Sequence, residues 1–208
     1  RALTRVIRNQ GNMGGIITAD LSDMEILKTR ARQASSKLNG DLVQFVSRPH
    51  IEHFGSGDKR IVMLDLGSKK GVLNSFNMRG CEIIAVPAGT SASEILAMQA
   101  DGVFISDGPG DPQAVPYAVE ITRALIGKIP IFGVGLGHQL IALAMGAEVV
   151  KLPYGHRGSN HPVKNLLNNR VYITTQNHGY TIKDDSLSGT DIEVIMRSLN
   201  DQTIEGIR

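Results

Sequence analysis

The feature that most constrains the fold is a regular alternation of strand-like and helix-like stretches through the middle of the chain. Four apolar stretches have the continuous hydrophobic character of strands buried on both faces, and four longer stretches typical of helices follow them in turn. The strands are expected at 60–66, 81–87, 101–107 and 129–135, and the helices at 68–80, 91–99, 112–127 and 137–147. This order predicts βαβ units and therefore an α/β fold, with a doubly wound, mostly parallel sheet covered on both faces.

The two ends of the chain depart from this alternation. From Val149 the sequence becomes rich in short strand patterns, and the last two are joined at 200–202 as a predicted hairpin. The stretch 47–59 mixes Pro, Gly, His and charged residues without periodicity, which is typical of a connector. The predicted organisation is a remnant of a small N-terminal α/β domain at 1–46, a linker at 47–59 and a main domain at 60–208.

Within 1–46 the pattern predicts a helix over the first ten residues, a short strand at 14–19 and a second helix. We expect Ser22 to be the N-cap of the second helix, because Glu25 stands at the capping-box position. The chain begins within a helical pattern and ends within a strand-like one, so we expect it to be a fragment of a longer protein, with the main domain truncated at its C-terminus.

Composition argues against several classes of function. The formal net charge is only +2 and the Lys and Arg residues are dispersed, so no nucleic acid partner is expected. No apolar run approaches the roughly 18 residues that a membrane span requires, so no membrane partner is expected. Because Cys81 is the single cysteine, no internal disulfide can form, and a reducing, cytoplasmic location is expected.

A glycine-rich segment, GVGLGHQ at 133–139, joins the last predicted strand of the alternation to its helix. It lacks the spacing of a dinucleotide-binding fingerprint, and no P-loop occurs in the chain, which disfavours an unrelated nucleotide-binding module. It matches the nucleophile elbow, G-x-Nu-x-G, with Gly133 and Gly137 at the places where small residues permit a sharp turn. The central residue is Gly135, so the nucleophile itself is missing. On this motif alone, a turn that merely permits close packing remains the alternative.

Further segments give the elbow a specific context. SDGPGDP at 106–112 follows the preceding strand, and its backbone N–H groups could supply a second oxyanion donor. Together with the elbow, with YGHRGSNHPVKN at 154–165 and with QNHGYTI at 176–182, it resembles the family of carbamoyl phosphate synthetase small subunits. These are class I glutamine amidotransferases. The resemblance covers nearly the whole chain and implies the class I glutaminase fold.

The resemblance also implies a function and its residues. Such a subunit hydrolyses L-glutamine and supplies ammonia to a large synthetase subunit, for arginine and pyrimidine biosynthesis. A cysteine at the elbow attacks the amide, assisted by a histidine that a glutamate orients. The implied nucleophile position is Gly135, and the implied oxyanion donors are the backbone amides of Leu136 and Gly108. Glutamine is expected to be held by Gly108, Gly110, Leu136, Gln139, Asn177, Gly179 and Tyr180.

Two departures from the family pattern bear on activity. Gly135 has no thiol, so no thioester can form, and Cys81 belongs to a different predicted strand. The family's His-Pro-Glu motif, which carries the histidine and the glutamate, does not occur in this sequence. We therefore expect a folded pocket that binds glutamine without turnover. The alternative is a non-catalytic pseudo-glutaminase, which keeps the pocket and the subunit interface while the large subunit uses free ammonia.

No cofactor is expected in this chain, because the resemblance places ATP and Mg²⁺ on the large subunit. No metal is expected either, since the six histidines show no metal-ligand spacing on a predicted helix. His138 and His178 are expected to fix loops near the pocket, and His156 and His161 are expected in a loop. Tyr180 stands where the family more often has phenylalanine, a change that should leave backbone contacts intact.

Overall fold

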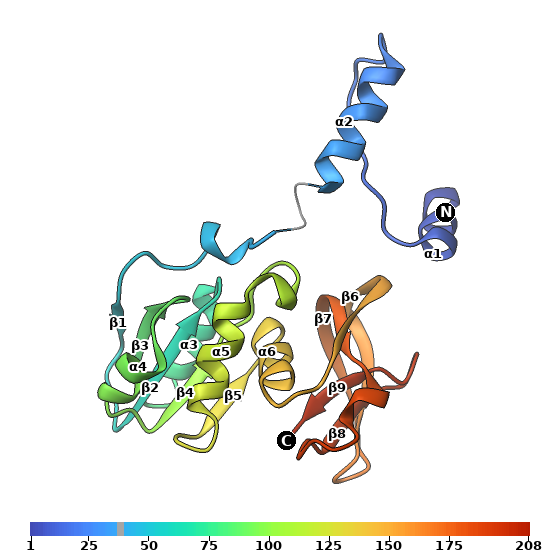
Figure 1. Ribbon diagram of the computed structural model, residues 1–208. Coiled ribbons are helices and arrows are strands. Elements are labelled where there is room, and N and C mark those ends of the chain that lie inside the picture. The colour runs from blue at the N-terminus through green and yellow to red at the C-terminus, as the bar shows by residue number, and fades with distance from the viewer. Residues whose placement is uncertain (37–39) are drawn as a thin grey trace.

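The computed structural model describes residues 1–36 and 40–208, so residues 37–39 of the predicted N-terminal remnant lie outside the described residues. Two helices, α1 (Ala2–Gln10) and α2 (Met24–Ser36), extend away from the main sheet (Figure 1). No side chain in 1–34 is buried. This part of the chain therefore contributes nothing to the hydrophobic core.

Two predictions for this part are wrong. Residues 14–19 form no strand, because no strand among the described residues pairs with them and a strand needs a partner for its backbone hydrogen bonds. The cap of α2 is Asp23 rather than Ser22. Asp23 Oδ1 accepts hydrogen bonds from the backbone N–H of Glu25, at 3.1 Å, and of Ile26, at 2.9 Å.

The main body is a five-stranded sheet with the strand order β1-β3-β2-β4-β5. Its strands are β1 (Glu52–Phe54), β2 (Lys59–Asp65), β3 (Cys81–Pro87), β4 (Gly102–Ile105) and β5 (Ile131–Gly133). The last four are parallel, which confirms the alternation. β1 runs antiparallel to β3 at the edge of the sheet and lies within the stretch predicted as a linker.

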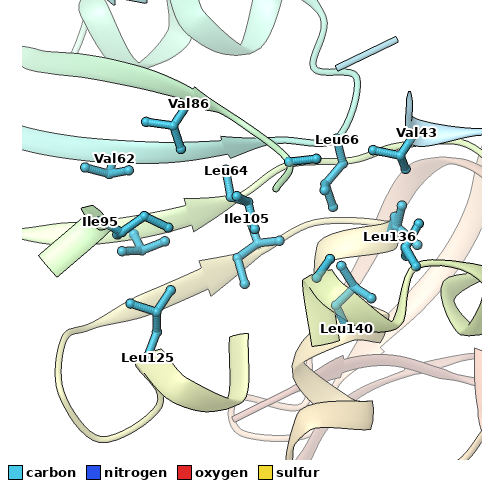
Figure 2. Packing of buried hydrophobic residues seen from close by; sticks show 14 of the residues in the cluster. Val43, Val62, Leu64, Leu66, Val86, Ile95, Ile105, Leu125, Leu136 and Leu140 are labelled. Carbon is cyan, nitrogen blue, oxygen red and sulfur yellow. The ribbon is translucent and has the colours of Figure 1, made fainter. Parts of the chain in front are cut away.

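Helices connect the parallel strands and cover both faces of the sheet. They are α3 (Lys70–Asn77), α4 (Ala92–Ala97) and α5 (Pro116–Leu125), while α6 (Leu136–Ala144) follows β5. The 3₁₀ turn η2 (Pro112–Ala114) precedes α5, and a second one, η1 (Val43–Phe45), precedes β1. Side chains of α4, α5 and α6 pack on one face with Leu64 and Ile105 (Figure 2). On the other face Leu73 of α3 packs against Met63 and Phe104. The chain therefore has the doubly wound α/β fold that the alternation predicts.

A second, antiparallel sheet follows α6. Its strands are β6 (Val149–Asn165), β7 (Val171–Ile182), β8 (Val194–Ser198) and β9 (Ile204–Ile207), with the 3₁₀ turn η3 (Asp184–Leu187) between β7 and β8. β6 and β9 each pair with both β7 and β8, so the four strands close on themselves. β8 and β9 form the predicted hairpin. Ala142 of α6 packs with Val149, Ile182 and Ile204, which joins this sheet to the main body.

The carboxyl ends of β2, β4 and β5 meet at one edge of the main sheet. There Leu66 N–H donates to Ser106 Oγ at 2.9 Å, and Val134 N–H donates to the carbonyl of Ile105 at 3.2 Å. Ligands of open α/β sheets bind outside this edge. Among the described residues, no helix combines the length and the apolar character needed to cross a membrane.

The packing at the centre of the sheet can be tested with Ile105→Ala, because the Ile105 side chain is fully buried between β4 and the helices. We expect the free energy of unfolding to fall by about 2–5 kcal/mol, through lost burial and the cavity left behind. Urea unfolding measures this change. The matched control is Ile17→Ala, where the side chain is fully exposed and the expected change is within about 0.5 kcal/mol. Equal effects at the two positions would contradict the packing described.

Candidate functional site

The elbow between β5 and α6 has the backbone geometry that the glycine pattern predicts. Gly135 is the N-cap residue of α6 and has φ 57° and ψ −115°, a region that L side chains rarely adopt. A Cβ on Gly133 would lie 2.6 Å from the carbonyl carbon of Gly137. A Cβ on Gly137 would lie 2.1 Å from the carbonyl oxygen of Ile105. The two flanking glycines therefore let the first turn of α6 lie directly against the ends of β4 and β5.

Two backbone N–H groups converge on one point beside this turn. The N–H of Gly108 lies 2.8 Å from Asp107 Oδ1, and the N–H of Leu136 lies 3.4 Å from the same oxygen. These are the two amides that the resemblance implies as oxyanion donors. A Cβ built on Gly135 would lie 2.2 Å from the same Asp107 oxygen. The point where two N–H groups meet is therefore also adjacent to the place of a side chain at the elbow.

The elbow opens into a pocket of about 640 Å³, a size within the range of small-molecule sites. All seven residues expected to hold glutamine line this pocket: Gly108, Gly110, Leu136, Gln139, Asn177, Gly179 and Tyr180. The first two come from the loop after β4, the next two from α6 and the last three from β7. The structure thus brings together residues far apart in the sequence, at the edge where the parallel strands end.

Gln139 and Tyr180 tie the two sheets together across the pocket. The buried side chain of Gln139 donates from Nε2 to the carbonyl oxygen of Tyr180 at 3.0 Å. Partial burial, together with the charge of Asp111 and a hydrogen bond to it, raises the pKa of the Tyr180 hydroxyl. The hydroxyl of Tyr180 thus interacts with Asp111, while its backbone carbonyl accepts from Gln139.

Several pocket residues were not identified from the sequence. Asn12 N–H donates to the carbonyl of Pro153 at 2.9 Å, which brings the segment 12–15 to one wall of the pocket. The cationic side chains of Lys69, Lys151 and Arg157 line the pocket as well. Cations of this kind suit an anionic group such as the α-carboxylate of an amino acid. Lys69 precedes α3, whereas Lys151 and Arg157 both lie in β6, so no regular spacing in the sequence groups the three.

The segment predicted as a loop around His156 and His161 is instead part of strand β6, and that prediction is wrong. β6 pairs with β7 on both sides of this segment, where His156 lies opposite His178 and His161 opposite Thr174. Its pairing is interrupted by two irregularities, between Lys151 and His156 and between Gly158 and His161. Glycine and polar residues at these irregularities have the composition of a loop, which explains the error.

Three histidines lie near Glu205 of β9, and one of them, His178, also lines the pocket. His156 lies 2.8 Å from Gln176 Oε1 through Nδ1 and 2.7 Å from Asp201 Oδ2 through Nε2. The Nδ1 atom of His178 lies 2.8 Å from the carbonyl oxygen of Tyr180, and its Nε2 atom faces Glu205 at 3.5 Å. The third, His138 on α6, has an Nε2 atom that is buried without a hydrogen-bond partner.

Electrostatics in this cluster follow from burial and pairing. Burial acts to lower the pKa of His178, but Glu205 and the Tyr180 carbonyl raise it above its ordinary value. Burial lowers the pKa of His138 to about 4, so its ring is neutral near pH 7. Burial alone would raise the pKa of Asp201, but hydrogen bonds, that from His156 foremost, lower it to about 2. The contacts of His156 with Gln176 and Glu205, and of His178 with Glu205, connect β6, β7 and β9.

A metal ion could be held at this cluster. Ligand atoms of His156, His178 and Glu205 all lie within 4.8 Å of one another. Among the described residues, these three side chains form the cluster with a spacing suited to a metal ion. His156 already has a partner at each ring nitrogen. The expectation that the chain carries no metal stays a prediction. Cys81 is half-buried at the start of β3, and it does not line the pocket.

Comparison with known proteins places this geometry in context. Residues 62–208 match the family model of class-I glutamine amidotransferases. The chain is 49% identical over 207 residues to the carbamoyl phosphate synthase small chain of Listeria monocytogenes, and 46% identical over 208 residues to that of Bacillus caldolyticus. All of this chain is covered in both comparisons. It spans only 56% and 57% of the length of these two relatives.

Solved structures agree in fold. A putative GMP synthase protein from Thermoplasma acidophilum superposes with a TM-score of 0.59 at 22% identity, over 72% of this chain and 77% of that one. A glutamine amidotransferase from Thermotoga maritima superposes with a TM-score of 0.54 at 14% identity, over 71% of this chain and 69% of that one. At these identities the likeness concerns the fold alone.

The close approach at the elbow can be tested with Gly137→Ala. The new Cβ would lie 2.1 Å from the Ile105 carbonyl oxygen, so the backbone must shift, and we expect the free energy of unfolding to fall by about 1–3 kcal/mol or more. The matched control is Gly71→Ala in the first turn of α3, where a Cβ would meet nothing within 4 Å. There alanine should raise stability by about 0.5–1 kcal/mol. Chemical denaturation that gave the two variants the same sign would refute the geometry.

Proposed function

The chain belongs to the class-I glutamine amidotransferase family, and from this premise we propose that it is the glutamine-binding part of a carbamoyl phosphate synthase small chain that lacks glutaminase turnover. The observation that carries the proposal is the elbow itself. Gly135 stands where a nucleophile is presented, next to two converging N–H groups, and glycine provides no reactive atom.

The chemistry of this site follows from the groups present. A nucleophile at the elbow would add to the amide carbon of glutamine, release ammonia and form a thioester that water then hydrolyses. With Gly135 no bond to the amide carbon can form, so bound glutamine leaves unchanged. His178 does not replace the missing groups, because one of its ring nitrogens faces the Tyr180 carbonyl and the other faces Glu205.

Binding, in contrast, uses groups that remain. The seven expected contact residues surround one pocket, and cationic side chains line it where an amino acid's α-carboxylate can be attracted. In this proposal the partner is the large chain of the synthase, which carries ATP and Mg²⁺ and uses the ammonia for arginine and pyrimidine biosynthesis. The location in this proposal is the cytoplasm.

A second reading is a pseudo-glutaminase that binds glutamine and the large chain while the large chain uses free ammonia. It differs from the first in what a restored nucleophile would do. In the first reading only the nucleophile has been lost from an otherwise competent small chain. In the second, other parts of the catalytic machinery are missing too.

Glutamine binding without turnover can be measured on the chain itself. Isothermal titration calorimetry should detect L-glutamine, and a coupled assay should detect no ammonia release. Gln139→Ala should weaken binding at least tenfold, because it removes a pocket wall and its link to the Tyr180 carbonyl. Gln113→Ala is the matched control, since Gln113 Nε2 donates to the carbonyl of Val149 at 2.9 Å outside the pocket. No binding by the unmodified chain would defeat the proposal.

The two readings can be separated by restoring the nucleophile in a full-length small chain that carries these residues, paired with the large chain. Gly135→Cys is combined with Asp107→Ala, because a Cβ at 135 would overlap the Asp107 carboxylate and alanine leaves room for it. In the first reading the double variant gains glutamine-dependent carbamoyl phosphate synthesis while ammonia-dependent synthesis is unchanged. Absence of any gain, with ammonia-dependent synthesis intact, would favour the pseudo-glutaminase.

A further inference from the structure

Asp107 carries a role that neither the elbow motif nor the family resemblance assigns. It follows β4 directly, and its Oδ1 atom lies at the point where the N–H groups of Gly108 and Leu136 converge, at 2.8 and 3.4 Å. The same oxygen lies 2.2 Å from where a Cβ of residue 135 would be. One carboxylate oxygen therefore fills both the oxyanion position and the space beside the missing nucleophile.

We propose that Asp107 sets the ligand specificity of this pocket, by presenting a carboxylate where an oxyanion site would present two bare N–H donors. A glutamine carbonyl oxygen cannot occupy a position that Asp107 Oδ1 already holds. The end of the ligand side chain then meets an anionic acceptor, which matches the NH₂ group of a primary amide and repels a carboxylate. The pocket thus selects an amino acid with an uncharged, donor-bearing side chain, such as glutamine, over its acidic counterpart, glutamate.

The position of Asp107 is determined by its surroundings. Ser106 Oγ donates to the Asp107 carbonyl at 2.7 Å and accepts from Leu66 N–H at 2.9 Å, which fixes the backbone at the end of β4. The side chain can lie against the elbow only because Gly135 has no Cβ. Asp107 also lines the pocket. A ligand in the pocket therefore meets the carboxylate directly.

The other charges around the pocket are the same in the unmodified chain and in Asp107→Asn. Lys69, Lys151 and Arg157 line it, and Asp111 interacts with the hydroxyl of Tyr180. Glutamine and glutamate share the α-amino and α-carboxylate groups, so attraction of these groups cancels in the ratio of the two affinities. What remains in the ratio is the interaction at the end of the side chain, and its change on Asp107→Asn reports the part that Asp107 contributes.

This inference rests on the proposed function, which identifies the pocket as an amino acid site. The first test measures the binding of L-glutamine and of L-glutamate by calorimetry. The unmodified chain should prefer glutamine, and Asp107→Asn should reduce the ratio of the two dissociation constants at least fivefold, through tighter binding of glutamate. The matched control is Asp101→Asn at the opposite end of β4, where an exposed carboxylate accepts from the N–H of Arg60 at 2.8 Å. That variant should leave the ratio unchanged. An unchanged ratio in Asp107→Asn would overturn the proposal.

A second measurement does not depend on amino acid binding. The thiol that Gly135→Cys introduces is alkylated with iodoacetamide across a pH range, and mass spectrometry of its peptide distinguishes it from Cys81. The new Cβ moves the Asp107 oxygen away from the two N–H groups but leaves the carboxylate next to the thiol, where it disfavours the thiolate. Gly135→Cys/Asp107→Asn should therefore react at least tenfold faster near pH 7 than Gly135→Cys, with its profile shifted at least one pH unit lower. Superimposable profiles would overturn the placement of the Asp107 carboxylate beside residue 135. If neither amino acid binds but the profiles differ, the proposed function fails while this placement stands.

Discussion

The close approach of the first turn of α6 to the end of β4 is the constraint on which the candidate site depends. Gly137 N–H donates to the carbonyl of Ser106 at 3.1 Å, a distance that is possible only because neither Gly133 nor Gly137 carries a side chain. This contact places the amide of Leu136 beside the amide of Gly108, although the two belong to different loops of the sheet. The convergence is made of backbone, so it does not require a particular side chain at residue 135.

That independence explains how the pocket forms with glycine at residue 135. The conformation of an elbow is determined by its flanking glycines and by the packing of α6. The side chain at the centre of the elbow does not stabilise that conformation. Leu136 and Leu140 of α6 are buried in the core beneath the main sheet. Glycine at residue 135 therefore leaves this buried apolar area intact. Glycine also relieves the strain that another residue would bear at φ 57°.

The fold could be predicted where the signal was local and repeated. Continuous apolar runs between helical stretches correctly predicted the parallel strands, and the spacing of Gly133 and Gly137 correctly predicted the elbow. Pairing between distant segments was harder to see. β1 was not predicted, because it lies within a stretch that has the composition of a linker. An edge strand of three residues needs little apolar character, so its sequence gives no strand signal. The histidine cluster was missed for a related reason, since its members come from α6, β6, β7 and β9 and share no sequence spacing.

Asp107 shows most clearly what a motif search cannot predict. Within its own segment it is an ordinary polar residue in a turn, and its orientation depends on the absence of a Cβ at a distant residue, Gly135. The two residues are therefore coupled. Alanine or serine at 135 would be as unable to form a thioester as glycine, yet either would displace the Asp107 oxygen from the two N–H groups. Changes at residues that share a space are not additive. Glycine at 135 consequently differs from other residues that lack a thiol. It alone leaves room for a carboxylate at the point where the two amides converge.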